Sequence, residues 1–192
     1  FGRRLGAYLL DYIIVYILAL VLGGALISSF SDRVQETLVG NMTQEEIDGY
    51  LEFEEKFDFD LMEFTVRSSA VQYTVSIFWL IYLLQEVIWG RALGKRMLGI
   101  QIGHEDGRRA ETGQLFLRYV LKGIPSMFGL LQFFIAPQST ALSILGSMIG
   151  LLFIVSCFWA FDKRRMALHD MPPHTAVFWK KELDKAADNS MR

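Results

Sequence analysis

Hydrophobic residues in this chain gather in four long segments, and charged residues gather in the stretches between them. The apolar segments cover residues 5–29, 70–89, 115–136 and 141–161. About 20 apolar residues are enough for a helix to cross the hydrocarbon core of a bilayer. The pattern therefore predicts an all-α transmembrane protein, a four-helix membrane bundle whose spans lie at these positions.

The third segment is less uniformly apolar than the others. Arg118 and Lys122 lie in its first third, four residues apart, and so share one face of a helix. Pro125 can bend or restart that helix, because its ring removes a main-chain hydrogen bond. We interpret residues 112–123 as lying partly in the inner interface, with the crossing made by residues 124–136. Alternatively, the third and fourth segments form only a re-entrant hairpin, which leaves both chain ends on one side.

Basic residues are distributed unevenly between the apolar segments. Residues 1–4 contain two Lys or Arg, residues 90–114 contain five and residues 162–192 contain seven, whereas residues 31–67 contain three against eleven acids. Lys and Arg are enriched in cytoplasmic loops. We therefore expect a multi-pass protein of the cell (plasma or inner) membrane, with both termini in the cytoplasm and residues 31–67 outside.

The first apolar segment is too long, and too polar at Asp11, to be a cleaved signal peptide. The chain begins at Phe1 rather than Met, so we expect it to be a fragment that lacks its start. We assign residues 1–180 to one membrane domain and residues 181–192 to a polar cytoplasmic tail.

The two polar connections carry signals of local structure. In the acidic one, Thr43 and Glu46 match a capping box, and aromatic residues alternate loosely with acids after it, which predicts one or two amphipathic helices over the outer mouth of the bundle. In the basic one, residues 94–102 alternate like a short strand before an Asp106-Gly107 turn. Residues 175–179 are also β-prone, so we expect a small cytoplasmic β-hairpin or three-strand patch.

Composition excludes several classes of function. The net charge is −2, which gives no support to nucleic-acid binding, and the lone Cys157 excludes an internal disulfide framework and is expected to be a buried structural thiol. His169, Asp170 and His174 match no familiar metal-site spacing. A phosphate-binding loop and a Ser–His–Asp order are both missing, so we expect no enzyme activity, no cofactor and no metal.

Asp11 is the only charge between residues 5 and 30. A carboxylate at the centre of a membrane helix costs roughly 2.5 kcal/mol or more, so it should face protein or water. Arg4 lies about 10.5 Å away along the same helix, so each of the two should meet a partner from another segment. We expect one polar cluster near the inner ends of the spans, made of Arg4, Asp11, Glu86, Lys95, Arg118, Lys122, His169 and Asp170.

Several motifs occur in a fixed order along the chain: RLGAYLLD at 4–11, GRALGKRMLGIQI at 90–102, RYVLK at 118–122 and FDKRRMALHD at 161–170. In this order the chain resembles the RDD family of membrane proteins. The resemblance implies that the arginine and two aspartates of the family name are Arg4, Asp11 and Asp170. It also implies a multi-span membrane protein with a transport role, without naming a substrate. Residues 31–67 are longer than the family pattern needs, and Pro172-Pro173 depart from it.

Two functions remain open at this point. In the first, the protein is a small transporter or a cation/proton antiporter subunit, in which Asp11, Glu86 and Asp170 bind a proton or cation. Four helices are few for such a path, so this function requires a homo-oligomer. In the alternative, the protein is a non-catalytic membrane scaffold or assembly factor, and the cluster is a structural ion-pair network. Its partners are then the lipid bilayer, anionic lipids at the basic cytoplasmic face, or another membrane protein.

Overall fold

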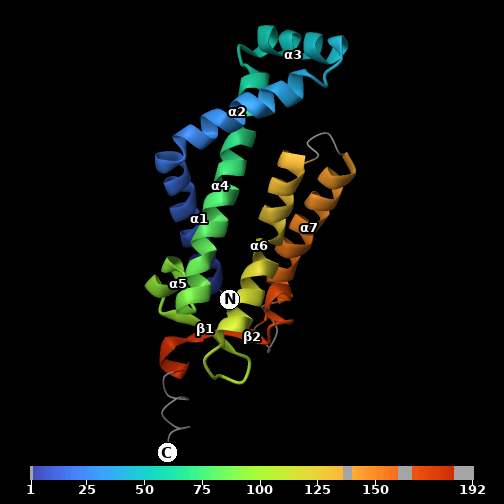
Figure 1. Ribbon diagram of the computed structural model, residues 1–192. Helices are drawn as coiled ribbons and strands as arrows, with labels where there is room; N and C mark the ends of the chain where they lie inside the picture. Colours follow the sequence, from blue (N-terminus) through green and yellow to red (C-terminus); the bar gives the residue numbers. More distant parts are fainter. Residues whose placement is uncertain (1, 136–139, 160–165, 184–192) are drawn as a thin grey trace, which may run out of the picture.

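The computed structural model describes residues 2–135, 140–159 and 166–183, which form an elongated, mostly helical structure with a small sheet at one end (Figure 1). Four helices run along its length: α1 (Gly2–Leu22), α4 (Leu61–Trp89), α6 (Thr112–Ile135) and α7 (Thr140–Trp159). At the far end from the sheet lie α2 (Gly24–Val39) and α3 (Gln44–Phe57). At the sheet end lie α5 (Leu93–Met97), β1 (Ile100–His104), the 3-10 helix η1 (Leu168–Asp170) and β2 (Thr175–Trp179).

Two of the described helices, α1 and α4, are long and apolar enough to cross a membrane. Only 22% of the apolar window of α1 and 33% of that of α4 is buried inside the structure. A helix in the core of a soluble protein would be mostly buried, so the exposed apolar surface of these two helices indicates a lipid environment.

The first apolar segment is divided into two helices rather than forming one. The division falls at Gly23, between α1 and α2. A Cβ atom on Gly23 would lie 2.6 Å from the Thr74 methyl carbon of α4, so only glycine allows the chain to pass α4 this closely. The chain then continues as α2 to Val39, well beyond the predicted boundary at Ser29.

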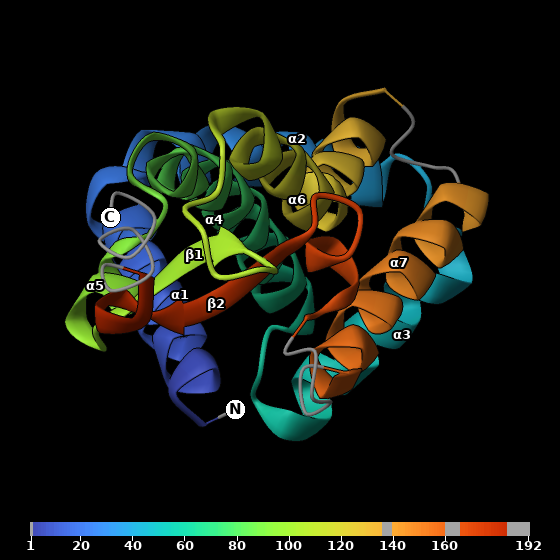
Figure 2. The ribbon, with the colours of Figure 1, turned by 90° about the horizontal axis from the view of Figure 1, so that it is seen from below.

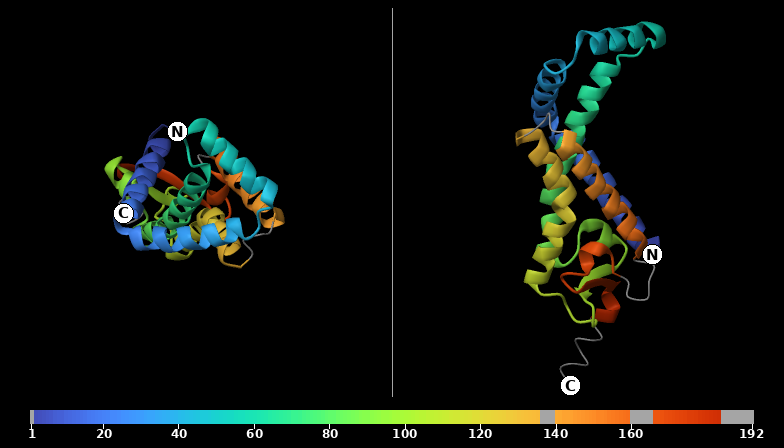
Figure 3. Two further views of the ribbon diagram at one scale, coloured as in Figure 1. Left: turned by 90° about the horizontal axis from the view of Figure 1, so that it is seen from above. Right: turned by 90° about the vertical axis from the view of Figure 1, so that its right-hand side faces the viewer.

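The acidic connection, residues 31–67, is mostly helical, as predicted. Thr43 and Glu46 form the expected capping box at the start of α3, and none of the residues of α3, all of which the structure describes, is buried. Asp60 then caps α4 by accepting a hydrogen bond from the Glu63 amide, so this helix begins well before residue 70. Figure 3 shows α3 lying across the end of α4, far from the sheet.

The third apolar segment forms one helix through Pro125. Residues 112–123 are therefore continuous with the part that we expected to make the crossing. This helix, α6, packs between α4 and α7 (Figure 1). At the end of α6 far from the sheet, Phe133 joins Phe30 of α2 and Val66 of α4 in an apolar cluster, which fixes these three helices to one another.

The predicted β-structure is present, but its main pairing is not a local hairpin. β1 pairs antiparallel with β2, with Ile100 opposite Trp179 and His104 opposite Thr175. The predicted turn after β1 does form, with Gly107 at a φ of 88°, but the returning chain adds only the single bridge of Gly103 with Arg109. The reason is that α6 starts three residues later and leaves no room for a strand.

The sheet lies across the ends of the helices that are far from α3 (Figure 2). Its apolar face, formed by Ile100, Ile102 and Val177, is buried against Ala7 of α1 and Leu115 of α6. The sheet thus ties the two halves of the chain together at the end where the predicted polar cluster should lie.

Candidate functional site

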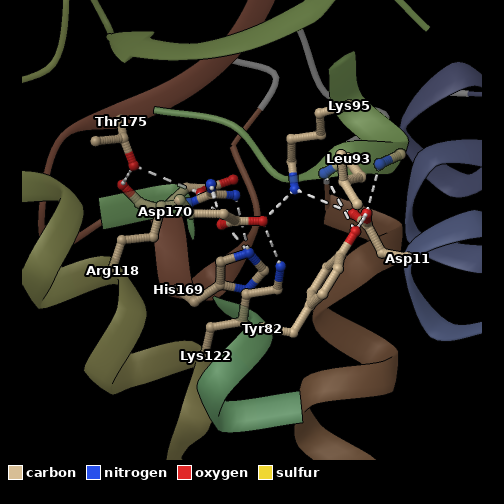
Figure 4. Close-up of polar contacts among 11 residues, drawn as sticks. Asp11, Tyr82, Leu93, Lys95, Arg118, Lys122, His169, Asp170 and Thr175 are labelled. Atoms are coloured by element: carbon tan, nitrogen blue, oxygen red, sulfur yellow. Dashed lines mark hydrogen bonds and ion pairs between the residues drawn. The ribbon is translucent and has the colours of Figure 1, made fainter. Parts of the chain in front are cut away.

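Six charged side chains meet at the sheet end of the bundle, and we refer to them as the charge cluster (Figure 4). They are the acids Asp11, Glu86 and Asp170 and the bases Lys95, Arg118 and Lys122. They come from α1, α4, α5, α6 and η1. No side chain among the six is more than 9% exposed.

Asp11 lies on the buried face of α1, in line with Ala7 and Val15. One of its oxygens, Oδ1, accepts hydrogen bonds from the Tyr82 hydroxyl at 2.5 Å and from the Gly94 amide at 2.6 Å. The other oxygen lies 3.9 Å from the Lys95 ammonium. Asp11 thereby holds the start of α5 against α1 and α4.

Glu86 lies in the last turn of α4 and is the centre of the charge cluster. Its Oε1 accepts hydrogen bonds from Lys95 and, at 2.9 Å, from Lys122, while its Oε2 accepts one from Arg118 at 3.2 Å. Lys95 can reach back to it because Gly90, at a φ of 66°, ends α4 in the left-handed conformation and reverses the chain.

Asp170, in η1, closes the charge cluster on the side of the sheet. Its Oδ1 accepts a hydrogen bond from Arg118 Nε at 2.5 Å, and its Oδ2 accepts one from the Ala167 amide at 3.1 Å. Burial alone would raise the pKa of the Asp170 carboxyl, but the charge of Arg118 beside it holds that pKa below its usual range. The guanidinium of Arg118 therefore joins Glu86 and Asp170.

The charges of the cluster balance. Three carboxylates face three cations, so the cluster is neutral when all six are ionised. Each carboxylate receives at least two hydrogen bonds. A buried charge is tolerated when it is paired and hydrogen-bonded, and this arrangement meets both conditions.

His169 lies at the edge of the charge cluster, with Nε2 3.4 Å from Arg118 Nη2. Burial lowers the pKa of His169 to about 4, so the ring is neutral in the folded protein at pH 7. In the unfolded chain a histidine titrates near 6.5. Between these two values the unfolded state binds more protons than the folded state, so stability should fall as the pH drops from about 6.5 to about 4.

We expect the titration of His169 to lower the unfolding free energy by up to about 3 kcal/mol as the pH falls from about 6.5 to about 4. Thermal unfolding in detergent between pH 7 and pH 4 measures the loss. The His169→Gln variant is the control, because it keeps a polar side chain but does not titrate. Equal pH dependence of the two proteins would contradict a neutral His169 in the folded protein.

Gly94 is the point of closest approach between α5 and α1. A Cβ atom there would lie 2.5 Å from the Ala7 carbonyl oxygen and 2.7 Å from Asp11 Oδ1. We expect Gly94→Ala to lower the unfolding free energy by about 1–3 kcal/mol, because the backbone must shift to accept the methyl group. Gly113→Ala, where a Cβ meets nothing within 4 Å in α6, should be neutral or slightly stabilising. Thermal unfolding of the two variants side by side measures the difference in stability. Equal effects of the two substitutions would contradict the close packing of α5 against α1 at Gly94.

The structure brings together all but one of the side chains predicted for the cluster, with His169 at its edge. Arg4 is the exception: the structure shows it donating to the Val177 carbonyl oxygen of β2 at 2.7 Å, and the partners of Asp11 come from α4 and α5. Arg4 therefore ties α1 to the sheet.

Sequence reasoning missed Tyr82 and the Gly94 amide. Tyr82 precedes Glu86 by four residues and so shares its helix face, a spacing that could have identified it. The main-chain amide of Gly94 has no signal in the sequence. Among the described residues no group of three or more His, Cys, Asp or Glu could hold a metal ion. The side chain of Cys157 lies outside the described part of the chain.

Comparison with known proteins agrees with the motifs and the membrane character of the helices. The family model described as "RDD family" matches residues 1–173. No curated protein and no solved structure matches the chain. The match covers the charge cluster and nearly all of the described helices. The chain therefore belongs to the RDD family, and it is a membrane-associated protein with a buried charge cluster.

Proposed function

We propose that the chain is a four-span, non-catalytic membrane protein with its sheet end in the cytoplasm. The acidic helix α3 and the sheet lie at opposite ends of the long helices, which supports opposite sides of a bilayer (Figure 3). At 1.5 Å per residue, the 29 residues of α4 span about 44 Å, more than the roughly 30 Å hydrocarbon core. Its first turns then extend into the outer aqueous phase, where Glu63 and Arg67 lie.

Exposed apolar side chains continue around the other two spans. On α6 they include Leu131 and Phe134, and on α7 they include Leu151 and Leu152, the last two being 62% and 57% exposed. Such a surface is unfavourable in water and favourable against lipid. This supports α6 and α7 as the remaining spans of the bundle.

The topology is testable by cysteine labelling. In a Cys157→Ser background, Glu52→Cys places a thiol on α3 and Arg108→Cys places one on the turn after β1. We expect a membrane-impermeant maleimide to label position 52 in intact cells or spheroplasts, and to label position 108 only after the membrane is opened. Labelling of position 108 in intact cells would contradict the proposed orientation.

The geometry best supports a scaffold or assembly factor in which the charge cluster is structural. The observation that carries this proposal is the cluster itself: it is buried and charge-balanced, and each carboxylate has at least two donors. A network of this kind holds the inner ends of α1, α4 and α6 to the sheet. The membrane protein then presents fixed surfaces to lipid and to a membrane-protein partner.

Crosslinking in the native membrane tests the scaffold role. A photo-reactive residue placed on the exposed surface of α3, or in the turn after β1, should give a recurrent crosslinked product with a second protein. The same photo-reactive residue at position 63 is the comparison. Glu63 is exposed and pairs with Arg67 near the start of α4, far from the turn after β1. Products that contain only lipid or only this chain at every position would contradict the scaffold role.

One observation favours transport as a second candidate. Lys95 lies between Asp11 and Glu86, so Asp11, Lys95, Glu86, Arg118 and Asp170 form an unbroken chain of ionisable groups. Proton relays in membrane proteins use such chains. A homo-oligomer would supply the path that four helices lack. Purified protein in proteoliposomes should then move H⁺, Na⁺ or K⁺ faster than its Asp11→Asn variant. Equal fluxes would exclude this candidate.

A further inference from the structure

The short helix α5 has two different faces. Gly94 and Lys95 are buried, and they supply an amide and an ammonium to the charge cluster. Leu93 and Met97 are 40% and 68% exposed, and Arg96 between them is exposed as well. The outward face of α5 thus combines two apolar side chains with one guanidinium group.

One tryptophan precedes α5 in the chain and another pairs with the strand that follows α5, and an arginine lies against each of them. Trp89 ends α4 just before α5, and the guanidinium of Arg96 lies 5.8 Å from its ring centre. Trp179 of β2 lies opposite Ile100 of β1, and the guanidinium of Arg3 lies 4.0 Å from its ring centre. Both rings are exposed. Tryptophan is enriched where the hydrocarbon core meets the headgroups, so this pairing is typical of a membrane interface.

An exposed apolar stripe on α4 leads to Trp89 and Arg96. Ile81, Leu84 and Ile88 are 61%, 40% and 68% exposed and recur at intervals of three and four residues, so they share one face of the helix. The stripe ends at Trp89, beside Arg96. It offers an acyl chain a continuous surface that runs from the middle of α4 to a cationic group.

We propose that the outer face of α5 is a binding site for an anionic phospholipid of the inner leaflet. The lipid phosphate accepts hydrogen bonds from Arg96, and an acyl chain packs on the stripe of α4. A phospholipid fits because it joins a phosphate to an apolar chain, as the protein joins Arg96 to that stripe. The inference rests on the proposed orientation, which puts α5 at the inner leaflet.

Binding at this site has a consequence for the charge cluster. Lys95 is buried and Arg96, the next residue of α5, is exposed, so a lipid that holds Arg96 also helps to hold Lys95 against Asp11 and Glu86. A ligand that binds only the folded state raises its stability. Anionic lipid should therefore stabilise the protein in detergent.

The test is thermal unfolding of the full chain in a non-ionic detergent, with phosphatidylglycerol, phosphatidylcholine or inorganic phosphate added. We expect phosphatidylglycerol to raise the unfolding midpoint by several degrees, and the other two to raise it much less. Arg96→Gln should lose most of this shift, and Arg96→Lys should keep most of it, because the charge remains. Arg67→Gln, which removes an exposed arginine at the opposite end of α4, is the matched control and should keep the full shift.

Three results would overturn the proposal: a full shift in Arg96→Gln, an equal shift with phosphatidylcholine, or an equal shift with inorganic phosphate. The last result would indicate an anion site rather than a lipid site. Failure here is distinct from failure of the scaffold role, because the Arg96 and Arg67 variants leave all six members of the charge cluster in place. Conversely, if Arg96→Gln abolishes the rise in unfolding midpoint caused by phosphatidylglycerol, that result supports the lipid site whether or not crosslinking finds a protein partner.

Discussion

Replacing Glu86 by Gln is expected to lower the unfolding free energy by about 3–5 kcal/mol, the size of effect seen when one partner of a buried ion pair is removed. Glu86 is the only acid that contacts all three cations of the charge cluster. Gln keeps the shape of the side chain but leaves two acids facing three buried cations. Thermal or denaturant unfolding of the purified protein in detergent measures the loss.

The matched control is Glu63→Gln on the same helix. Glu63 pairs with Arg67 four residues along α4, and the two side chains are 65% and 73% exposed. An exposed pair of this kind contributes little, so the control should change the unfolding free energy by no more than about 0.5 kcal/mol. Equal effects of the two Glu→Gln substitutions would show that burial in the charge cluster has no special energetic role.

The second large effect is expected at Arg118. Arg118→Leu removes the donors to Glu86 and Asp170 at once and leaves both carboxylates buried with fewer partners. We expect a loss of about 3–5 kcal/mol. Lysine should not substitute fully, because its single ammonium cannot reproduce the fork of a guanidinium that bridges two acids.

A double-mutant cycle identifies the pairing with Asp170. We expect Arg118→Leu combined with Asp170→Asn to be less destabilising than the sum of the two single changes, by about 1–3 kcal/mol, since residues in one ion-pair network couple in this range. The exposed pair of Arg67 and Glu63 gives the comparison cycle, with coupling of at most about 0.5 kcal/mol. Additive effects at Arg118 and Asp170 would contradict the geometry.

Much of the helical architecture could be predicted from the sequence, because apolar segments and capping signals are local. The capping box of Thr43 and Glu46 forms as expected, α4 contains the predicted second segment, and α6 contains the described part of the third. The break at Gly23 could not be predicted, because it depends on the close approach of Thr74 from another helix. The pairing of β1 with β2 depends in the same way on chain segments far apart in sequence.

The members of the charge cluster could be predicted because a charge in an apolar segment must find a partner. That reasoning names Asp11, Glu86 and Arg118 correctly as members of one cluster. It cannot assign the pairs. The sequence predicts that Arg4 and Asp11 each meet a partner from another segment, and both do. It does not show that the partner of Arg4 is a carbonyl oxygen of β2 or that a partner of Asp11 is Tyr82. Which donor meets which acid is decided by how the helices and the sheet pack.

The charge cluster also changes how the family residues are understood. Asp11 holds α5 through an amide and a hydroxyl, and Asp170 holds η1 through Arg118 and the Ala167 amide. Both aspartates therefore fix main chain as well as side chains. This double role favours a structural network that positions the sheet end of the protein, including the face of α5 that we assign to lipid.

The most direct test of the structural role is thermal unfolding of the Asp11→Asn variant beside the wild-type protein in the same detergent. Asn keeps the size of the side chain but removes the charge that faces Lys95 and weakens the acceptor for Tyr82 and Gly94. We expect the variant to lose about 2–4 kcal/mol of unfolding free energy, the range for charge-assisted bonds in a buried site. An unchanged unfolding midpoint would contradict a structural role for the charge cluster and would favour transport.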